Sequence, residues 1–159
     1  MYYSFDTSIK INSIFKAEDY FPAIVTFSAE EVNNVFIEFS YRDTDMFELV
    51  GSSMDGIIKQ FTLTLCNHFE VYDDNMNTPD AMEGTIFFSK NDSIECEMFN
   101  LRIYKNGLRI DMSQKRTDKF LKCGQLIFVF ADDESLVSLY VTDLSDLDIS
   151  HVLEEVSIN

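Results

Sequence analysis

The sequence predicts an α+β fold that is predominantly antiparallel β, either a sandwich or a strongly curved sheet, with a helix at the C-terminus. Three observations lead to this prediction. Apolar and polar residues alternate with a period of two through much of the chain, two hairpin signals stand in its second half, and helical spacing is clear only near its end. Pro and Gly are scarce and no linker composition is present, so we expect one domain over residues 1–159.

Short alternating runs predict several strands in addition to the longer ones described below. They lie at residues 2–5, 8–14, 23–28, 35–42 and 85–90. The segment "SAEE" at the end of the third run can cap a short helix, because Ser28 and Glu31 have capping-box spacing.

The longest alternation, in "QFTLTLCNHFEVY", predicts a strand over residues 59–72. Its apolar residues from Phe61 onward fall on one face and polar residues on the other, which is typical of a strand with one solvent-exposed face. A helix remains an alternative for residues 52–60, because Ser52 and Asp55 have the spacing of a capping box. We prefer the strand.

The segment "NLRIYKNGLRIDM" predicts a β-hairpin. Asn106-Gly107 suits a two-residue type I′ turn, because both central residues of that turn need positive φ. The turn would pair Ile103 with Ile110 on an apolar face. Upstream, the alternation changes phase near Met98, which indicates a β-bulge.

A second hairpin is predicted from "LIFVF" and "LVSLYVT", joined by "DDES" at residues 132–135. A four-residue loop places Leu126 opposite Val141, Phe128 opposite Leu139, and Phe130 opposite Val137. The first strand is apolar on both faces, so we expect it to be central in its sheet.

The C-terminal helix is predicted from "SDLDISHVLEEV", in which Ser145 and Asp148 form a capping box. The residues expected on its apolar stripe are Leu147, Val152, Leu153 and Val156.

The charge is strongly negative, with a formal net charge of −16 at pH 7. Eight carboxylates follow Cys123 and no Lys or Arg does. Such a surface repels nucleic acids and anionic membranes and favours a basic protein as partner. The segment "QKRTDKFLK" at residues 114–122 combines basic residues with an aromatic residue, as single-stranded nucleic-acid-binding segments do. We interpret it instead as a solvated loop whose positive charges are balanced by acidic neighbours.

The sequence offers little for catalysis or metal binding, and we expect neither an enzyme nor a cofactor. Cys66 and His68 fall on one face of the predicted strand, but a single strand does not orient a base toward a nucleophile. The loop "DDNMNTPDAMEG" begins like an EF-hand and then departs from it at Thr78 and Gly84. The three cysteines form no C-x-x-C pair, and no leader or membrane span is apparent, so we expect a soluble cytoplasmic protein with reduced thiols.

Clusters of carboxylates with nearby tyrosines are the candidate partner-binding site. The residues expected to contact the partner are Glu70, Tyr72, Asp73, Asp74, Asp80, Glu83, Asp132, Asp133, Glu134, Tyr140, Asp143, Asp146 and Asp148. Tyrosines anchor protein interfaces, and carboxylates raise the rate of encounter with a basic partner. We expect charge reversal at residues 132–134 to slow partner capture more than it lowers the melting temperature.

The chain resembles the immunity proteins of bacterial toxin systems, including those of contact-dependent growth inhibition. The resemblance rests on "HFEVYDDNMNTPDAMEG" and "FADDESLVSLYVTDLSDLDIS", two acidic segments in a β-rich chain without a catalytic motif. It implies a basic cognate toxin, often a nuclease, that is bound one-to-one and neutralised by blocking its active cleft. The alternatives are a nucleic-acid mimic or adaptor that binds another basic protein, a structural protein, a nucleic-acid binder, or an enzyme with scattered site residues.

Overall fold

The computed structural model describes residues 1–28 and 34–158, which form two large β-sheets, a two-stranded sheet and one helix. The six-stranded sheet has the order β10 (Asp92–Glu95), β4 (Asn34–Tyr41), β5 (Asp45–Ser52), β6 (Ile58–Leu65), β3 (Phe21–Thr26) and β2 (Ile14–Glu18). The seven-stranded sheet has the order β7 (Phe69–Val71), β11 (Asn100–Ile103), β12 (Leu108–Asp111), β15 (Leu136–Val141), β14 (Leu126–Ala131), β13 (Thr117–Cys123) and β8 (Met82–Glu83).

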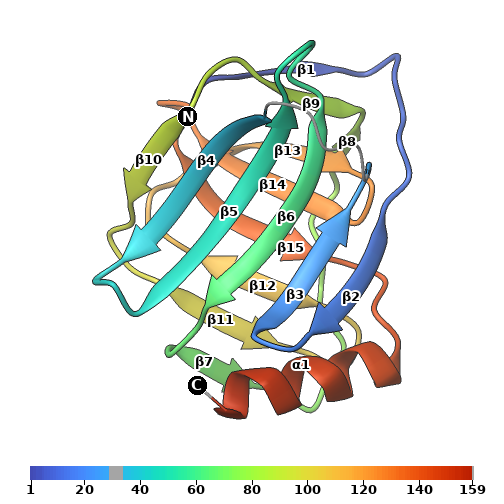
Figure 1. Cartoon of the computed structure of the whole chain (residues 1–159), viewed down its shortest axis with the longest axis vertical. Helices are drawn as coiled ribbons and strands as arrows, with labels where there is room; N and C mark the ends of the chain where they lie inside the picture. The colour runs from blue at the N-terminus through green and yellow to red at the C-terminus, as the bar shows by residue number, and fades with distance from the viewer. Residues whose placement is uncertain (29–33, 159) are drawn as a thin grey trace.

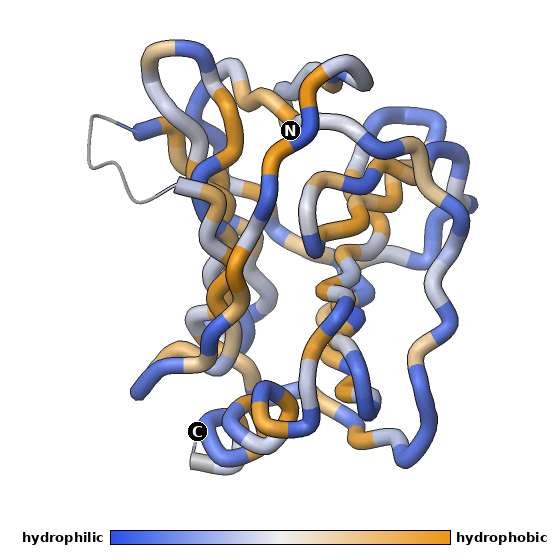
Figure 2. Tube along the Cα trace, turned by 90° about the vertical axis from the view of Figure 1, so that its right-hand side faces the viewer, coloured by the Kyte–Doolittle hydropathy of each residue, from blue (hydrophilic) through white to orange (hydrophobic). Residues whose placement is uncertain are grey.

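The two large sheets pack face to face, with the six-stranded sheet in front in Figure 1 and the two layers seen edge-on in Figure 2. β1 (Tyr3–Asp6) pairs with β9 (Thr85–Phe88) at the top, and α1 (Asp146–Ile158) packs against β2 and β3 at the bottom. The prediction of a mainly antiparallel β fold with a C-terminal helix is confirmed. None of the helical residues described forms a segment long and apolar enough to cross a bilayer.

One apolar core lies between the sheets and contains residues of both. Phe47 on β5 stacks on Phe39 with ring centroids 4.6 Å apart and also contacts Phe99, which leads into β11, at 6.4 Å. All three side chains are buried. Burial of such rings, at about 25 cal/mol per Å² of apolar surface, is the main force holding the sheets together.

The predicted strand over residues 59–72 is two strands in different sheets, and the helix alternative for residues 52–60 is wrong. β6 ends at Leu65, and the chain crosses to the other sheet before β7 begins at Phe69. The cause is Asp45, whose carboxylate accepts hydrogen bonds from the amides of Asn67 (2.7 Å) and His68 (3.0 Å). These amides are therefore withdrawn from any strand ladder.

Other boundaries also differ from the predictions. The expected strand at residues 8–14 begins only at Ile14, because the preceding segment bonds to side chains instead of a neighbouring strand, as Ile9 does through its carbonyl to Thr85. The presumed bulge near Met98 is a crossover from β10 in one sheet to β11 in the other. The "SAEE" segment extends into residues outside those described.

The basic segment is also a strand, β13, where a loop was expected. It pairs with β14 through Phe120 and Val129, with Phe120 partly buried on the outer face of the sheet. The hydrophobic spacing of this strand was hidden by its four neighbouring cations.

The hairpin at residues 100–112 keeps the predicted faces but has a different register. Ile103 pairs with Leu108, and the turn is Lys105-Asn106, closed by a 2.9 Å hydrogen bond from the Tyr104 amide to the Gly107 carbonyl. Gly107 is required for space: a Cβ there would lie 2.7 Å from the Val141 carbonyl oxygen and would also collide with a side chain.

We therefore expect Gly107→Ala to destabilise the protein by about 1–3 kcal/mol, the usual cost of overpacking. The chain has no tryptophan, so urea denaturation is followed by far-UV circular dichroism to obtain the free energy of unfolding. Adding Met76→Ala removes the side chain that a Cβ would meet, but leaves the Val141 carbonyl in place, so we expect only partial recovery. Wild-type stability in the single variant would contradict the close approach.

The second hairpin and the helix follow the predictions more closely. Leu126 pairs with Val141 and Phe128 with Leu139, whereas Phe130 pairs with Leu136 because the register shifts after Val129. β14 is buried throughout and lies inside the sheet, as expected, and the same holds for β15, for which no position was predicted.

The capping box of the helix is present. The Ser145 amide donates to Asp148 Oδ2 (2.9 Å), and the Asp148 amide donates to Ser145 Oγ (3.1 Å). Val152 and Val156 are buried as predicted, but Leu147 is 65% exposed and Ile149 lies in the core instead.

Candidate partner-binding surfaces

Two of the three carboxylates in the acidic loop at residues 132–134 are neutralised by lysines of the basic segment at residues 114–122. Lys115 Nζ lies 2.8 Å from Asp133 Oδ2, and Lys119 Nζ lies 2.9 Å from Glu134 Oε1. Tyr3 also donates a hydrogen bond to Glu134. The Lys115 ammonium holds the pKa of Asp133 well below its ordinary value. Asp132 is the one residue of the three without such a partner among the described contacts, so this loop offers less free charge than the sequence suggested.

The segment Tyr72–Ala81, here called the strap, crosses the outer face of the seven-stranded sheet. It connects β7 at one edge of that sheet to β8 at the other. Figure 2 shows it along the right-hand side, outside the sheet and mostly hydrophilic. Met76 is the buried residue of the strap, and its side chain packs on Ile127, Val129 and Tyr140.

The strap and the segment that leads into α1 both bond to the Lys105-Asn106 turn, and both segments carry predicted carboxylates. The Met76 amide donates to Asn106 Oδ1 (2.8 Å), and the Lys105 amide donates to the Asp74 carbonyl (3.1 Å). The Leu144 amide donates to the Asn106 carbonyl (3.1 Å) and so fixes the segment that leads into α1. The segments that carry Asp73, Asp74 and Asp143 therefore meet at the Lys105-Asn106 turn, where Asp73 also forms an ion pair with Lys105 (3.7 Å).

The two predicted tyrosines, Tyr72 and Tyr140, differ in how much of their surface a partner could contact. Tyr72 stacks on Tyr104 with centroids 4.9 Å apart, and its hydroxyl donates to Glu70, which raises the pKa of Tyr72. Tyr140 is only 6% exposed because it lies under the strap, so it has little surface to offer a partner.

The remaining predicted residues are spread out. Glu83 pairs with Lys10 at 3.3 Å on the far edge of the sheet, Asp80 lies on the strap, and Asp148 is occupied in the helix cap. The predicted set is therefore divided between the strap end, the far edge and the neutralised loop.

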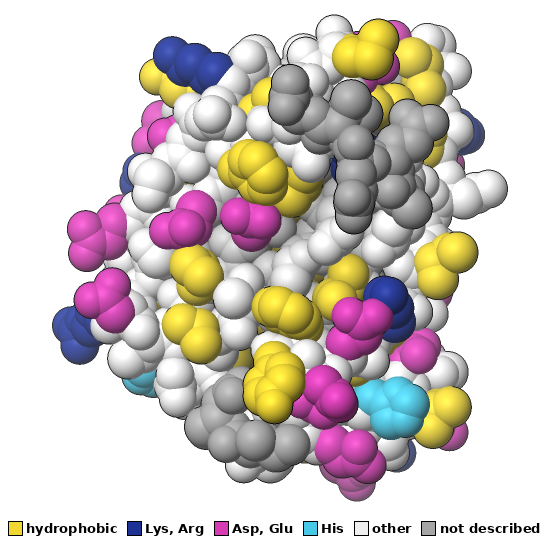
Figure 3. Space-filling view, viewed as in Figure 1, with side chains coloured by type: hydrophobic (Ala, Val, Ile, Leu, Met, Phe, Trp, Pro, Cys, Tyr) yellow, Lys and Arg dark blue, Asp and Glu magenta, His cyan; other side chains and the backbone are white. Residues whose placement is uncertain are grey.

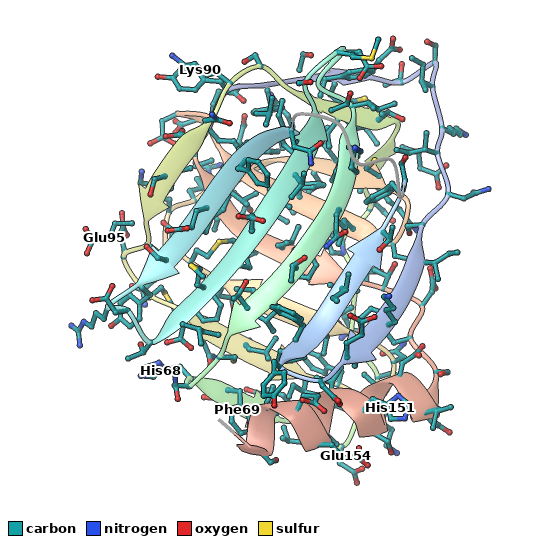
Figure 4. All side chains as sticks on the ribbon, viewed as in Figure 1. His68, Phe69, Lys90, Glu95, His151 and Glu154 are labelled. Atoms are coloured by element: carbon teal, nitrogen blue, oxygen red, sulfur yellow. The ribbon has the colours of Figure 1, made fainter. Side chains whose placement is uncertain are left out.

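A third acidic surface was missed by sequence reasoning. Glu38 on β4 and Glu48 on β5 lie directly opposite each other. Glu95 on β10 is in register with Ser40, two residues after Glu38 on β4, and so lies diagonal to Glu38. We call these three glutamates the acidic band. Figure 3 shows acidic side chains across this front face, and Figure 4 labels Glu95 at its β10 end.

The band could not be found by scanning for runs of carboxylates, because each residue stands alone in the sequence and comes from a different strand. The available signal was the short connection after Tyr41, which places Glu38 opposite Glu48 once residues 45–52 are recognised as a strand.

The Glu38–Glu48 pair has an electrostatic cost. Partial burial and the nearby Glu38 carboxylate raise the pKa of Glu48. Like charges directly opposite each other on antiparallel strands are destabilising. Within residues 1–28 and 34–158, no Lys or Arg forms an ion pair with a member of the band.

We expect Glu48→Gln to stabilise the fold by about 0.2–1 kcal/mol at neutral pH, the range for cross-strand pairs. Because the pKa is raised in the folded state, the ionised Glu48 opposes folding above that pKa, and the cost disappears as pH falls through it. The gain should therefore vanish below the ordinary glutamate pKa. Urea denaturation at both pH values tests this, with Glu154→Gln on α1 as the control; an equal gain at both pH values would contradict the assignment.

Cys66 and His68 do not form a nucleophile–base pair. Cys66 is fully buried, and burial together with Asp45 raises the pKa of its thiol to about 12. His68 Nδ1 instead lies 2.5 Å from Asp45 Oδ2, and its ring contacts Tyr41 edge-on. The Asp45–His68 contact orients the imidazole, but the thiol is not available as a nucleophile beside it.

Metal binding and known relatives give no further assignment. Among the residues that the structure describes, no three His, Cys, Asp or Glu side chains are grouped to hold a metal ion. No protein-family model matches the chain, and no curated protein matches it significantly.

Proposed function

We propose that this protein binds and neutralises a basic protein, in the manner of a bacterial immunity protein that blocks the active cleft of a cognate toxin. The observation that supports the proposal best is that many of the Lys and Arg side chains already form ion pairs within the protein. Within residues 1–28 and 34–158, seven Lys and Arg residues form ion pairs with carboxylates of the same chain: Lys10, Lys16, Arg102, Lys105, Arg109, Lys115 and Lys119.

These ion pairs leave a large excess of carboxylates facing solvent. A field of this sign attracts a basic protein and can raise association rates to about 10⁸–10⁹ M⁻¹ s⁻¹ at low salt. A nuclease is a suitable target, because its cleft is built to hold phosphates and carboxylates can occupy the same positive potential. Binding of nucleic acid through residues 114–122 is disfavoured, since Lys115 and Lys119 are already paired.

The test is affinity capture from the source organism at low and at high salt. We expect one basic protein to be retained at low salt and released as salt rises, and its enzymatic activity to fall when this protein is added in equimolar amount. Capture without inhibition would favour the alternative, an adaptor or nucleic-acid mimic that binds another basic protein. Failure to retain any basic protein at low salt would contradict the proposal.

A further inference from the structure

Among the residues that the structure describes, no element covers the outer face of the six-stranded sheet at the acidic band. In Figure 1 no described helix or strand lies in front of β4, β5 and β6. Beside the band on the same face, Phe36 is 43% exposed and Val50 is directly opposite it in register. A hollow of about 450 Å³ runs along this face, and its lining includes Phe36, Glu48 and Val50 together with two cations, Lys16 and Lys59. Lys16 forms an ion pair with Glu18, and Lys59 donates a hydrogen bond to Asn34 Oδ1 (3.1 Å).

The neighbours of the two opposed carboxylates do not neutralise them. Glu48 is in register with Thr62 on its other side, and Glu38 with Ser93. Gln60 donates its amide to Thr62 (2.8 Å) and not to a carboxylate. The fold therefore holds two carboxylates together on a half-buried surface where a cation from outside would relieve their repulsion.

We propose that the acidic band and Phe36 form the docking surface for the basic partner, with an arginine side chain of that partner seated between Glu38 and Glu48. This inference rests on the proposed function. Arginine fits better than lysine because its planar fork can donate to both carboxylates at once, while its aliphatic stem lies on apolar surface. The ring of Phe36 adds a cation–π contact of the kind that guanidinium groups make.

The surface can be tested without the partner. The probes are N-acetylated, C-amidated tetra-arginine and tetra-lysine peptides, titrated into the protein while the side-chain carboxylate resonances of its glutamates are followed by NMR. We expect saturable shifts at Glu38 and Glu48, tighter binding of tetra-arginine than of tetra-lysine, and binding about 10-fold weaker in Glu38→Gln/Glu48→Gln. The matched control, Asp73→Asn/Asp74→Asn, removes the same charge at the strap and should bind like the wild type.

Equal weakening in both double variants would show that only net charge matters and would overturn the inference. Equal affinity for the two peptides would overturn the arginine assignment. Failure of this inference and failure of the proposed function can be told apart. Basic-protein capture that survives Glu38→Gln/Glu48→Gln would refute this surface and leave the function standing, whereas peptide binding at the band without any captured protein would refute the function.

Discussion

Asp45→Ala is expected to unfold at a much lower denaturant concentration than the wild type, with a loss of about 3–5 kcal/mol, as when one partner of a buried polar network is removed. Asp45 is completely buried, and its carboxylate accepts bonds from Thr44 Oγ1 (2.8 Å), from two successive backbone amides and from His68 Nδ1. No other acceptor in the described contacts replaces it.

The loss should be largest where the chain crosses between sheets. Asp45 holds the segment between β6 and β7, so we expect the amides of Asn67 and His68 to exchange with solvent faster in the variant than those of β14. Calorimetry and hydrogen exchange measure both effects. Asp43→Asn, a change to an exposed carboxylate in the same turn, is the control, since Asn tolerates the positive φ of 57° found there. A loss below about 1 kcal/mol in Asp45→Ala would contradict the role assigned to this carboxylate.

The triple change Glu38→Gln/Glu48→Gln/Glu95→Gln is expected to weaken capture of the basic partner by about 100-fold or more, while the fold becomes no less stable. Close charge pairs across protein interfaces couple by about 1.5–7 kcal/mol, and the changes also remove repulsion within the free protein. Surface plasmon resonance gives the affinity and urea denaturation gives the stability.

The matched control is Asp73→Asn/Asp74→Asn/Asp143→Asn, which removes the same number of charges at the strap end. Its capture should weaken much less than that of the triple glutamine variant. The reverse order would place the interface at the strap and would support the sequence-based choice of Asp73, Asp74 and Asp143 instead of the band.

Sequence patterns predicted those features that depend on neighbours along the chain. The helix cap at Ser145 and Asp148 and two pairs of the second hairpin depend only on short-range chemistry, and both were found as expected. The break after Leu65 was not predictable in the same way, because it depends on a carboxylate twenty residues earlier.

The candidate site shows the same division. Runs of carboxylates, such as residues 132–134, are visible in the sequence, but their neutralisation by Lys115 and Lys119 depends on strand pairing. The acidic band is the opposite case: its members are isolated in the sequence and become neighbours through antiparallel and parallel pairing of three strands. The register, which period-two alternation alone does not set, decided both outcomes.

The most direct test of the account is the rate at which the captured basic protein associates with the wild type and with the triple glutamine variant, measured by stopped flow over a range of ionic strengths. We predict that the wild-type rate falls steeply as salt rises and that the variant starts slower and falls less. Rates that are the same for both proteins, or that do not change with salt, would contradict the claim that unpaired carboxylates on the six-stranded sheet attract the partner.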